Sequence, residues 1–307
     1  MDRHTRQNTE GEHHSGDSEV VLPKGVTVGH WSDTRGRTGC TVVLVPGGAV
    51  AGVDVRGGAP GTLGTDALRP GTLVERAQAV LLTGGSLYGL EAAAGVMQFL
   101  EERGVGLQIG PLKVPAVAGA VIFDLLAGDP RARPNRDNGL AACQSATPAP
   151  AMGGVGAGTG ATVAKAGNGD ETQPGGVGIA TVTAGGARVA AVMVANSMGG
   201  IWDDDRHEWI APLTRWDRGA GLVPGANTTI GVVVTDARLN KEQVNRVAAI
   251  AHDGIARAVR PAHTMYDGDT MFCLATGDNP AAADAVEVAA ADVVARAIAA
   301  GVRAARR

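Results

Sequence analysis

The chain has 307 residues, of which 44% are hydrophobic, 19% are charged and 3% are aromatic, with 46 glycines. This composition excludes a disordered chain and a coiled coil, and the length allows a large core built mainly from Ala, Val and Gly. A formal net charge of −4 gives no electrostatic reason to expect nucleic acid or an anionic membrane as a partner.

The N-terminus and the cysteines are typical of a cytoplasmic protein. Residues 1–19 are polar and lack the apolar core of a signal peptide, so we expect a disordered tail there and one catalytic domain over 20–307. Cys40, Cys143 and Cys273 lie far apart without metal-ligand spacing, which fits a reducing compartment. No uncharged apolar run reaches the length of about 20 residues that a membrane span requires.

The first half of the chain predicts a mixture of helices and strands. Residues 41–61 contain two apolar runs around Pro-Gly-Gly, which predicts a β-hairpin. Residues 72–82 begin with Thr and Glu at capping-box spacing and predict a helix. A second helix is predicted over 86–104, where apolar residues recur at helical spacing up to a glycine. Residues 116–126 predict a buried strand.

The second half is richer in strands. After the glycine-dense segment 153–160, residues 177–196 predict two strands around an Ala-Gly-Gly turn. Further strands are predicted over 229–236 and 270–277.

Two helices complete the predicted set. Residues 240–259 begin with Asn and Gln at capping-box spacing, and residues 281–305 are rich in Ala and Val. Because helices and antiparallel strands occur in clusters and not in strict β-α alternation, their order favours a layered α+β sandwich over a doubly wound parallel sheet.

Three motifs resemble functional loops without matching them. The glycine-rich stretch 156–165 lacks the ending of a phosphate loop, because Lys165 lies between two alanines. Segment 84–89 has Tyr88 where a nucleophile elbow requires Gly, so its serine is interpreted as a helix N-cap. The acidic stretch 203–209 has some capacity to bind a cation, but a solvated loop is the favoured interpretation, and no metal site is predicted.

The segment VPGANTTIGVVVTD (223–236) joins a turn to an apolar strand at the Asn227–Thr228 bond. A threonine at such a junction can attack its own preceding carbonyl, carry the acyl group on its side-chain oxygen and be released by water. The freed α-amine, with a pKa of about 8, can then act as base for the same hydroxyl. Thr228 is therefore either a strand residue or the nucleophile of a self-cleaving enzyme.

Asp267 and Asp269 flank a glycine just before an apolar strand. Their carboxylates are expected to lie near one strand end, where a pair can orient an amine or share a proton. An ordinary turn is the alternative interpretation.

Seven blocks, quoted in chain order, carry a resemblance to a known family: DVRGGAPGT, LLTGGSLYGLEAAAGV, AVIFDLL, GAGTGATVAK, ANSMG, GANTTIGVVVTDARL and HTMYDGDTMF. They resemble the autoprocessing aminopeptidases, which include L-aminopeptidase/D-esterases, β-peptidyl aminopeptidases and nylon-oligomer hydrolases. The resemblance implies a four-layer αββα sandwich, distantly similar to ornithine acetyltransferase. It also implies self-cleavage into an α subunit (1–227) and a β subunit (228–307), a tetramer of such pairs, and no metal or organic cofactor.

The same resemblance implies a role for each site residue. Thr228 is the nucleophile, Lys165 tunes or polarises it, and Asn196 donates to the oxyanion. Asp267 and Asp269 hold the ammonium group and the proton network. A threonine with a lysine and two aspartates is similar to the branch that hydrolyses nylon (6-aminohexanoate) oligomers. The alternative interpretations are that Lys165 is an ordinary solvated lysine and that Asn196 belongs to a strand-end turn without a catalytic role.

One position departs from that branch. Phe123 stands where the nylon-oligomer hydrolases have a pocket tyrosine, and Tyr88 is a candidate substitute. The expected function is hydrolysis of small amide or peptide substrates through an acyl-enzyme on Thr228. The alternatives are an aminopeptidase or esterase for short peptides or peptide amides, an acyltransferase resembling ornithine acetyltransferase, and a metabolite-binding protein in which Thr228 stays uncleaved.

Overall fold

The computed structural model describes residues 20–166, 172–213 and 225–307. The predicted tail over 1–19 and the Val-Pro that opens the turn before Thr228 lie outside these residues. The helices are α1 (Ala92–Glu101), α2 (Arg136–Gln144), α3 (Lys241–Ala258) and α4 (Ala283–Ala305), with 3-10 turns η1 (Asp66–Leu68), η2 (Ser86–Glu91) and η3 (Gly156–Gly158). The strands are β1 (Thr27–Asp33), β2 (Thr38–Val55), β3 (Thr62–Leu63), β4 (Arg76–Thr83), β5 (Leu107–Ile109), β6 (Leu112–Val114), β7 (Val117–Val121), β8 (Thr162–Val163), β9 (Gln173–Pro174), β10 (Gly176–Ala184), β11 (Ala187–Asn196), β12 (Gly200–Asp203), β13 (Glu208–Ala211), β14 (Thr228–Ala237), β15 (Val259–Arg260) and β16 (Thr270–Asn279).

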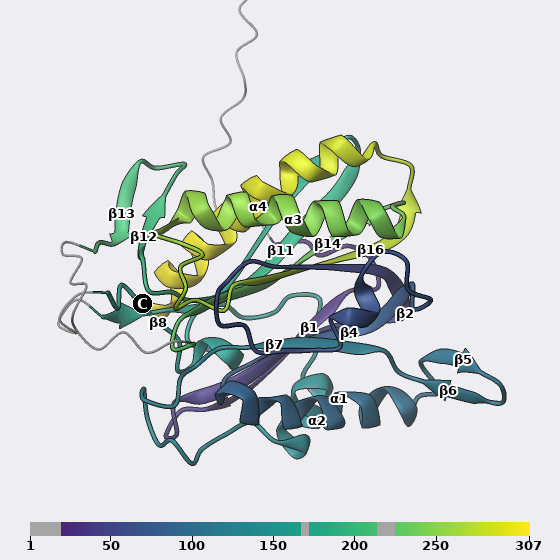
Figure 1. Cartoon of the computed structure of the whole chain (residues 1–307), viewed down its shortest axis with the longest axis horizontal. Coiled ribbons are helices and arrows are strands. Elements are labelled where there is room, and N and C mark those ends of the chain that lie inside the picture. The colour runs from purple at the N-terminus through teal and green to yellow at the C-terminus, as the bar shows by residue number, and fades with distance from the viewer. Residues whose placement is uncertain (1–19, 167–171, 214–224) are drawn as a thin grey trace, which may run out of the picture.

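Strands lie between two pairs of helices, with α3 and α4 on one side and α1 and α2 on the other (Figure 1). Among the described residues the main sheet has nine strands in the order β10-β11-β14-β16-β2-β4-β7-β3, with β1 added on β2. One apolar core lies under α3 and α4, a second lies between strand faces, and a third lies under α1 and α2. This arrangement is the four-layer αββα sandwich, so the expected fold class is confirmed.

The strand β2 links the two strand layers, and the hairpin predicted over 41–61 is wrong. Both halves of β2 pair with β4, and the register shifts between Leu44 and Ala49. The Pro-Gly-Gly sequence therefore makes a bulge inside one long strand. Gly48 adopts a φ of +73° there, which glycine tolerates at a bulge. Val42 faces the α1–α2 core, whereas Val43 faces the core between the strand layers.

The helix predicted over 72–82 is also wrong, because the segment forms strand β4 from Arg76 onward. It is paired on both edges, antiparallel to β2 and parallel to β7. Successive residues pack into different cores. Val80 and Leu82 pack into the core between the strand layers, and Leu81 packs into the core under α1 and α2. Burial of both faces and pairing of both edges outweigh the local capping signal. The Thr72 hydroxyl caps no helix and donates to the Ala67 carbonyl at 2.6 Å.

Most of the other predicted elements are confirmed. The segment 177–196 forms the antiparallel pair β10 and β11, and the predicted capping box opens α3, where Asn240 and Gln243 exchange side-chain and backbone bonds. The helix predicted over 86–104 begins as η2 and continues as α1. Ser86 is not an N-cap, because it lies inside η2 with a φ of +54°. Sequence reasoning missed α2.

The acidic stretch 203–209 forms the turn between β12 and β13, and its residues from Asp205 to Trp209 are exposed, as expected for a solvated loop. Its carboxylates are paired with arginines of the two covering helices; the pairs are Asp203–Arg303, Asp204–Arg257 and Asp205–Arg296. These ion pairs attach the turn to α3 and α4. Across the described ranges, no helix combines the length and the apolar character that a membrane span needs.

The close approach of α4 to strand β10 predicts that a larger residue at the contact destabilises the fold. A Cβ on Gly178 of β10 would lie 1.8 Å from the Ala297 carbonyl oxygen of α4. We expect Gly178→Ala to lower the free energy of unfolding by about 1–3 kcal/mol, because helix and strand must separate. Gly47→Ala is the matched control, since nothing lies within 4 Å of its Cβ position. Thermal unfolding monitored by circular dichroism measures both, and equal melting temperatures would contradict the packing argument.

Candidate functional site

The predicted site residues meet where three strands end. Asn196, the last residue of β11, pairs with Thr228, the first residue of β14. The strands β14 and β16 are parallel, so both start at the same edge of the sheet, and Asn227 forms a bridge with Asp267 there. Asn196, Thr228, Asp267 and Asp269 are all buried.

The peptide group before Thr228 lies between a hydroxyl and an amide. The Thr228 hydroxyl donates to the Asn227 carbonyl oxygen, and the Gly268 N–H donates to the same oxygen at 2.9 Å. A Cβ on Gly268 would lie 2.9 Å from the Thr228 Oγ and 2.8 Å from the Ala59 carbonyl oxygen. Only glycine therefore brings this N–H to the carbonyl without displacing the hydroxyl. The arrangement can stabilise negative charge on that oxygen.

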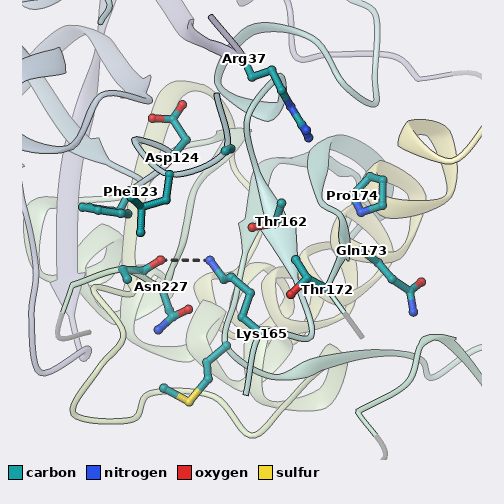
Figure 2. Close-up of a pocket in the computed structure, with 13 residues that line it drawn as sticks. Arg37, Phe123, Asp124, Thr162, Lys165, Thr172, Gln173, Pro174 and Asn227 are labelled. Carbon is teal, nitrogen blue, oxygen red and sulfur yellow. Dashed lines mark hydrogen bonds between the residues drawn. The ribbon is translucent and has the colours of Figure 1, made fainter. Parts of the chain in front are cut away.

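Lys165 is held against the same segment. Its Nζ donates to three oxygens at 3.0 Å each: the Asn196 carbonyl, the Asn196 Oδ1 and the Ala226 carbonyl. Figure 2 shows the side chain reaching toward the backbone beside Asn227, with the bond to Ala226 dashed. Burial lowers the pKa of Lys165 to about 7, although the charges of Asp267 and Asp124 oppose the shift. Lys165 is therefore not a solvated lysine.

Asn196 is fixed by bonds on both ends of its amide. Its Oδ1 accepts from the Thr162 N–H and the Lys165 Nζ, both at 3.0 Å. Its Nδ2 donates to the Phe123 carbonyl oxygen at 3.3 Å. This amide ties the lysine to the sheet edge, and its predicted role as an oxyanion donor stays a prediction.

The two carboxylates have different surroundings. Asp267 Oδ2 accepts from the Thr264 N–H at 2.9 Å and from its hydroxyl at 2.5 Å. Asp269 Oδ1 accepts from the Thr229 N–H at 2.6 Å, and its Oδ2 contacts His263 Nδ1 at 2.7 Å. Burial and the nearby charge of Asp269 raise the pKa of Asp267. The raised pKa lets the Asp267 carboxyl group hold a proton more readily than an ordinary aspartate.

Sequence reasoning missed three residues of this site. Gly268 and His263 lie inside the block HTMYDGDTMF (263–272), where residue type alone indicates only the acidic pair. Asp124 was visible as a lone carboxylate in the apolar run AVIFDLL. It accepts from the Gly85 N–H and the Thr38 hydroxyl, each at 2.7 Å, and burial raises its pKa.

A cavity of about 570 Å³ is lined by Asn227 and Lys165, among other residues. Phe123 lines it (Figure 2), and its role in a substrate pocket stays a prediction. Tyr88 is not among the lining residues. It is 59% exposed, and the Arg133 guanidinium covers its ring at 3.7 Å from the centroid. The further lining residues are Arg37, Asp124, Leu126, Ala127, Thr162, Thr172, Gln173, Pro174, Met198 and Ala226.

Comparison with known proteins gives consistent matches over most of the chain. The sequence pattern of Peptidase family S58 matches residues 23–307. An uncharacterized aminopeptidase of Mycobacterium leprae (strain TN) is 44% identical over 299 residues, covering 90% of this chain and 78% of the relative. A 6-aminohexanoate-oligomer endohydrolase of Kocuria sp. (strain KY2) is 33% identical over 280 residues, covering 83% of this chain and 74% of the relative.

A solved structure of known fold class has the same architecture as this chain. The L-aminopeptidase D-Ala-esterase/amidase from Ochrobactrum anthropi, described as a variant of the Ntn hydrolase fold, superposes with a TM-score of 0.71. The match covers 94% of this chain and 86% of that protein at 20% sequence identity. The four-layer sandwich is therefore an Ntn-hydrolase-type fold.

The environment of Lys165 predicts a measurable titration. Asp267 favours the ammonium form, so Asp267→Asn is expected to lower the pKa of Lys165 below its wild-type value of about 7. An NMR titration of the isotope-labelled Lys165 side chain measures this pKa directly in both proteins. Asp66→Asn is the control, because that side chain is 88% exposed on η1. A wild-type pKa near 10, or an increase in Asp267→Asn, would show that the charge balance described here is wrong.

Proposed function

The chain belongs to peptidase family S58 and is a hydrolase acting on amide bonds, and we propose that it is an autoproteolytic N-terminal-threonine amidohydrolase. One observation carries the proposal. The Thr228 hydroxyl contacts the Asn227 carbonyl, whose oxygen also accepts the Gly268 N–H. A nucleophile and an oxyanion donor therefore already surround the bond to be cut.

Self-cleavage proceeds in two steps under this proposal. The Thr228 Oγ adds to the Asn227 carbonyl carbon, and the Gly268 N–H stabilises the oxyanion. The bond to the Thr228 nitrogen then breaks, and the hydroxyl proton ends on that nitrogen, which leaves an ester. Water hydrolyses the ester to a carboxylate on Asn227 and a free hydroxyl on Thr228. Lys165 keeps the preceding peptide in place through the Ala226 carbonyl.

Turnover reuses the same groups. The new α-amine of Thr228 accepts the hydroxyl proton, and the substrate carbonyl takes the position of the Asn227 carbonyl beside the Gly268 N–H. Asp269 accepts a hydrogen bond from the N–H of Thr229, the residue after the nucleophile. Together with Asp267, it holds the ammonium group that forms on Thr228. The Thr228 Oγ adds to the substrate carbonyl carbon, the substrate C–N bond breaks, and the leaving amine takes the proton from the Thr228 ammonium group. Water then hydrolyses the acyl-enzyme, which releases the acyl product as a carboxylate and restores the Thr228 hydroxyl. The proposed chemistry uses only protein groups and water.

The cavity suggests where the acyl part of the substrate binds. Ala226 and Asn227 line it and precede the cut bond, so they occupy the acyl side in the uncleaved chain. After cleavage the Asn227 carboxylate is no longer joined to Thr228, so under this proposal the acyl side of the site becomes available to a substrate. Phe123, Leu126 and Met198 offer apolar contacts along it.

For the substrate class, we propose linear amides of the 6-aminohexanoate-oligomer type. The support is the 33% identity to an enzyme named for them, together with the Thr, Lys and two Asp at the site. The alternative is an aminopeptidase or esterase acting on short peptides or peptide amides, which the 44% identical relative favours by name. The same proposal includes a cytoplasmic tetramer of heterodimers, each built from 1–227 and 228–307.

Cleavage gives the first test. We expect the purified protein to migrate as two fragments, with the smaller beginning Thr-Thr-Ile-Gly-Val in N-terminal sequencing. Thr228→Ala lacks the hydroxyl and is expected to remain one inactive chain, whereas Thr228→Ser should retain part of the cleavage. Intact masses distinguish this cut from nicking in the turn 203–209. A wild-type chain that stays whole yet hydrolyses amides would refute the mechanism.

Acceptor dependence separates hydrolysis from acyl transfer. Amino-acid p-nitroanilides, β-peptides and aminohexanoate oligomers are compared side by side in buffer without added amine. We expect continuous product release from at least one class, because water reaches the acyl-enzyme, and none from Thr228→Ala. Turnover that appears only when an acceptor amine is added would favour an acyltransferase resembling ornithine acetyltransferase. A Thr228 that never becomes an N-terminus and a chain that turns over no substrate would favour a metabolite-binding protein.

A further inference from the structure

We propose that His263 is a positioning residue of this site, acting as an imidazolium that pairs with Asp269 and keeps it directed at the backbone of the nucleophile strand. The inference rests on the proposed function and adds a residue to it. His263 touches no reacting atom, so its effect passes through Asp269.

Both ring nitrogens of His263 face acceptors. Nδ1 contacts Asp269 Oδ2 at 2.7 Å, and Nε2 contacts the His252 carbonyl oxygen at 3.4 Å. A backbone carbonyl and an ionised carboxylate can only accept hydrogen bonds. The ring satisfies both contacts only when both nitrogens carry a proton, which is the charged form.

The backbone of His263 reinforces this geometry. Its φ of +56° is uncommon for a residue other than glycine, and it lets the His263 N–H donate to the same Asp269 Oδ2 at 3.0 Å. The other oxygen of Asp269 accepts from the Thr229 N–H. Asp269 is thus clamped between His263 on one side and the residue after the nucleophile on the other.

The neighbours of His263 decide where the positive charge lies. His252 packs edge-on against the ring with 4.8 Å between centroids, and its Nε2 contacts the Asp54 carbonyl at 3.1 Å. Burial lowers the pKa of His252 to about 4, so that ring is neutral. Arg56 disfavours a charge on His263 and is itself paired with Asp54 at 2.8 Å.

The balance at His263 favours the charged ring. Burial opposes its ionisation, but the hydrogen bond and the charge of Asp269 outweigh burial and raise its pKa above the ordinary value. The cation offsets the negative charge of Asp269 beside Asp267, whose own pKa is raised. A neutral His263 would leave Asp269 without this counter-charge and would favour sharing of a proton between the two acids. The charge on His263 is fully present at low pH and is lost as pH rises through its raised pKa.

The test replaces the charge and keeps the backbone. Asn tolerates a left-handed φ and can donate a hydrogen bond, so His263→Asn removes mainly the positive charge. His207→Asn is the matched control, because His207 also has a positive φ of 53° and is exposed in the β12–β13 turn. We expect His263→Asn to lower kcat by up to about 100-fold with little change in KM, as for a displaced catalytic group. The control should match wild type.

Imidazole ¹⁵N NMR tests the charge itself without needing activity. At pH 7 both His263 nitrogens should be protonated in wild type, and Asp269→Asn should lower the pKa of that ring. One unprotonated nitrogen in wild type, or an unchanged kcat in His263→Asn, would overturn the inference. If wild type never cleaves itself, the proposed function fails, but the NMR result still decides the charge of His263.

Discussion

The parallel pairing of β14 and β16 is the constraint on which the site depends. Because Ile230 lies opposite Thr270, the residues just before both strands reach the same sheet edge. The loop before β16 then presents the Gly268 N–H to the Asn227 carbonyl and Asp269 to the Thr229 amide. A register shift of one residue would move these groups by about 3.3 Å and separate them. Backbone geometry, more than any side chain, therefore assembles the site.

Small residues allow the layers to approach one another. In α1, a Cβ on Gly95 would lie 1.9 Å from the Arg136 carbonyl of α2, and in α2, one on Gly139 would lie 1.9 Å from the Ala92 carbonyl of α1. The two helices touch backbone to backbone, as β10 and α4 do. Close packing of this kind explains how a chain with few aromatic residues still forms three dense cores.

The sequence was informative where local chemistry and tertiary structure agree. Capping residues located α3, apolar runs bounded by turn residues located β10, β11, β14 and β16, and the motif around Asp267 located one wall of the site. It failed at β4, where helical capping signals competed with pairing partners far away in the chain. It also failed at Pro46, because a bulge and a hairpin turn use the same residues. His263 and Gly268 could not be assigned by residue type, since one acts through its ring and conformation and the other through a backbone N–H that has no sequence signature.

The strand order has a consequence for the folding of the processed protein. β14 and β16 lie side by side in the main sheet, with β11 on one flank and β2 on the other. Under the proposed cleavage, the fragment that begins at Thr228 is inserted between strands of the other fragment. The intact precursor folds in a unimolecular reaction, whereas the cut pair, once denatured, must find each other in solution. The mature enzyme would then owe its persistence to slow unfolding and not to reversible refolding, and each active molecule would derive from a single folding event of the uncut chain.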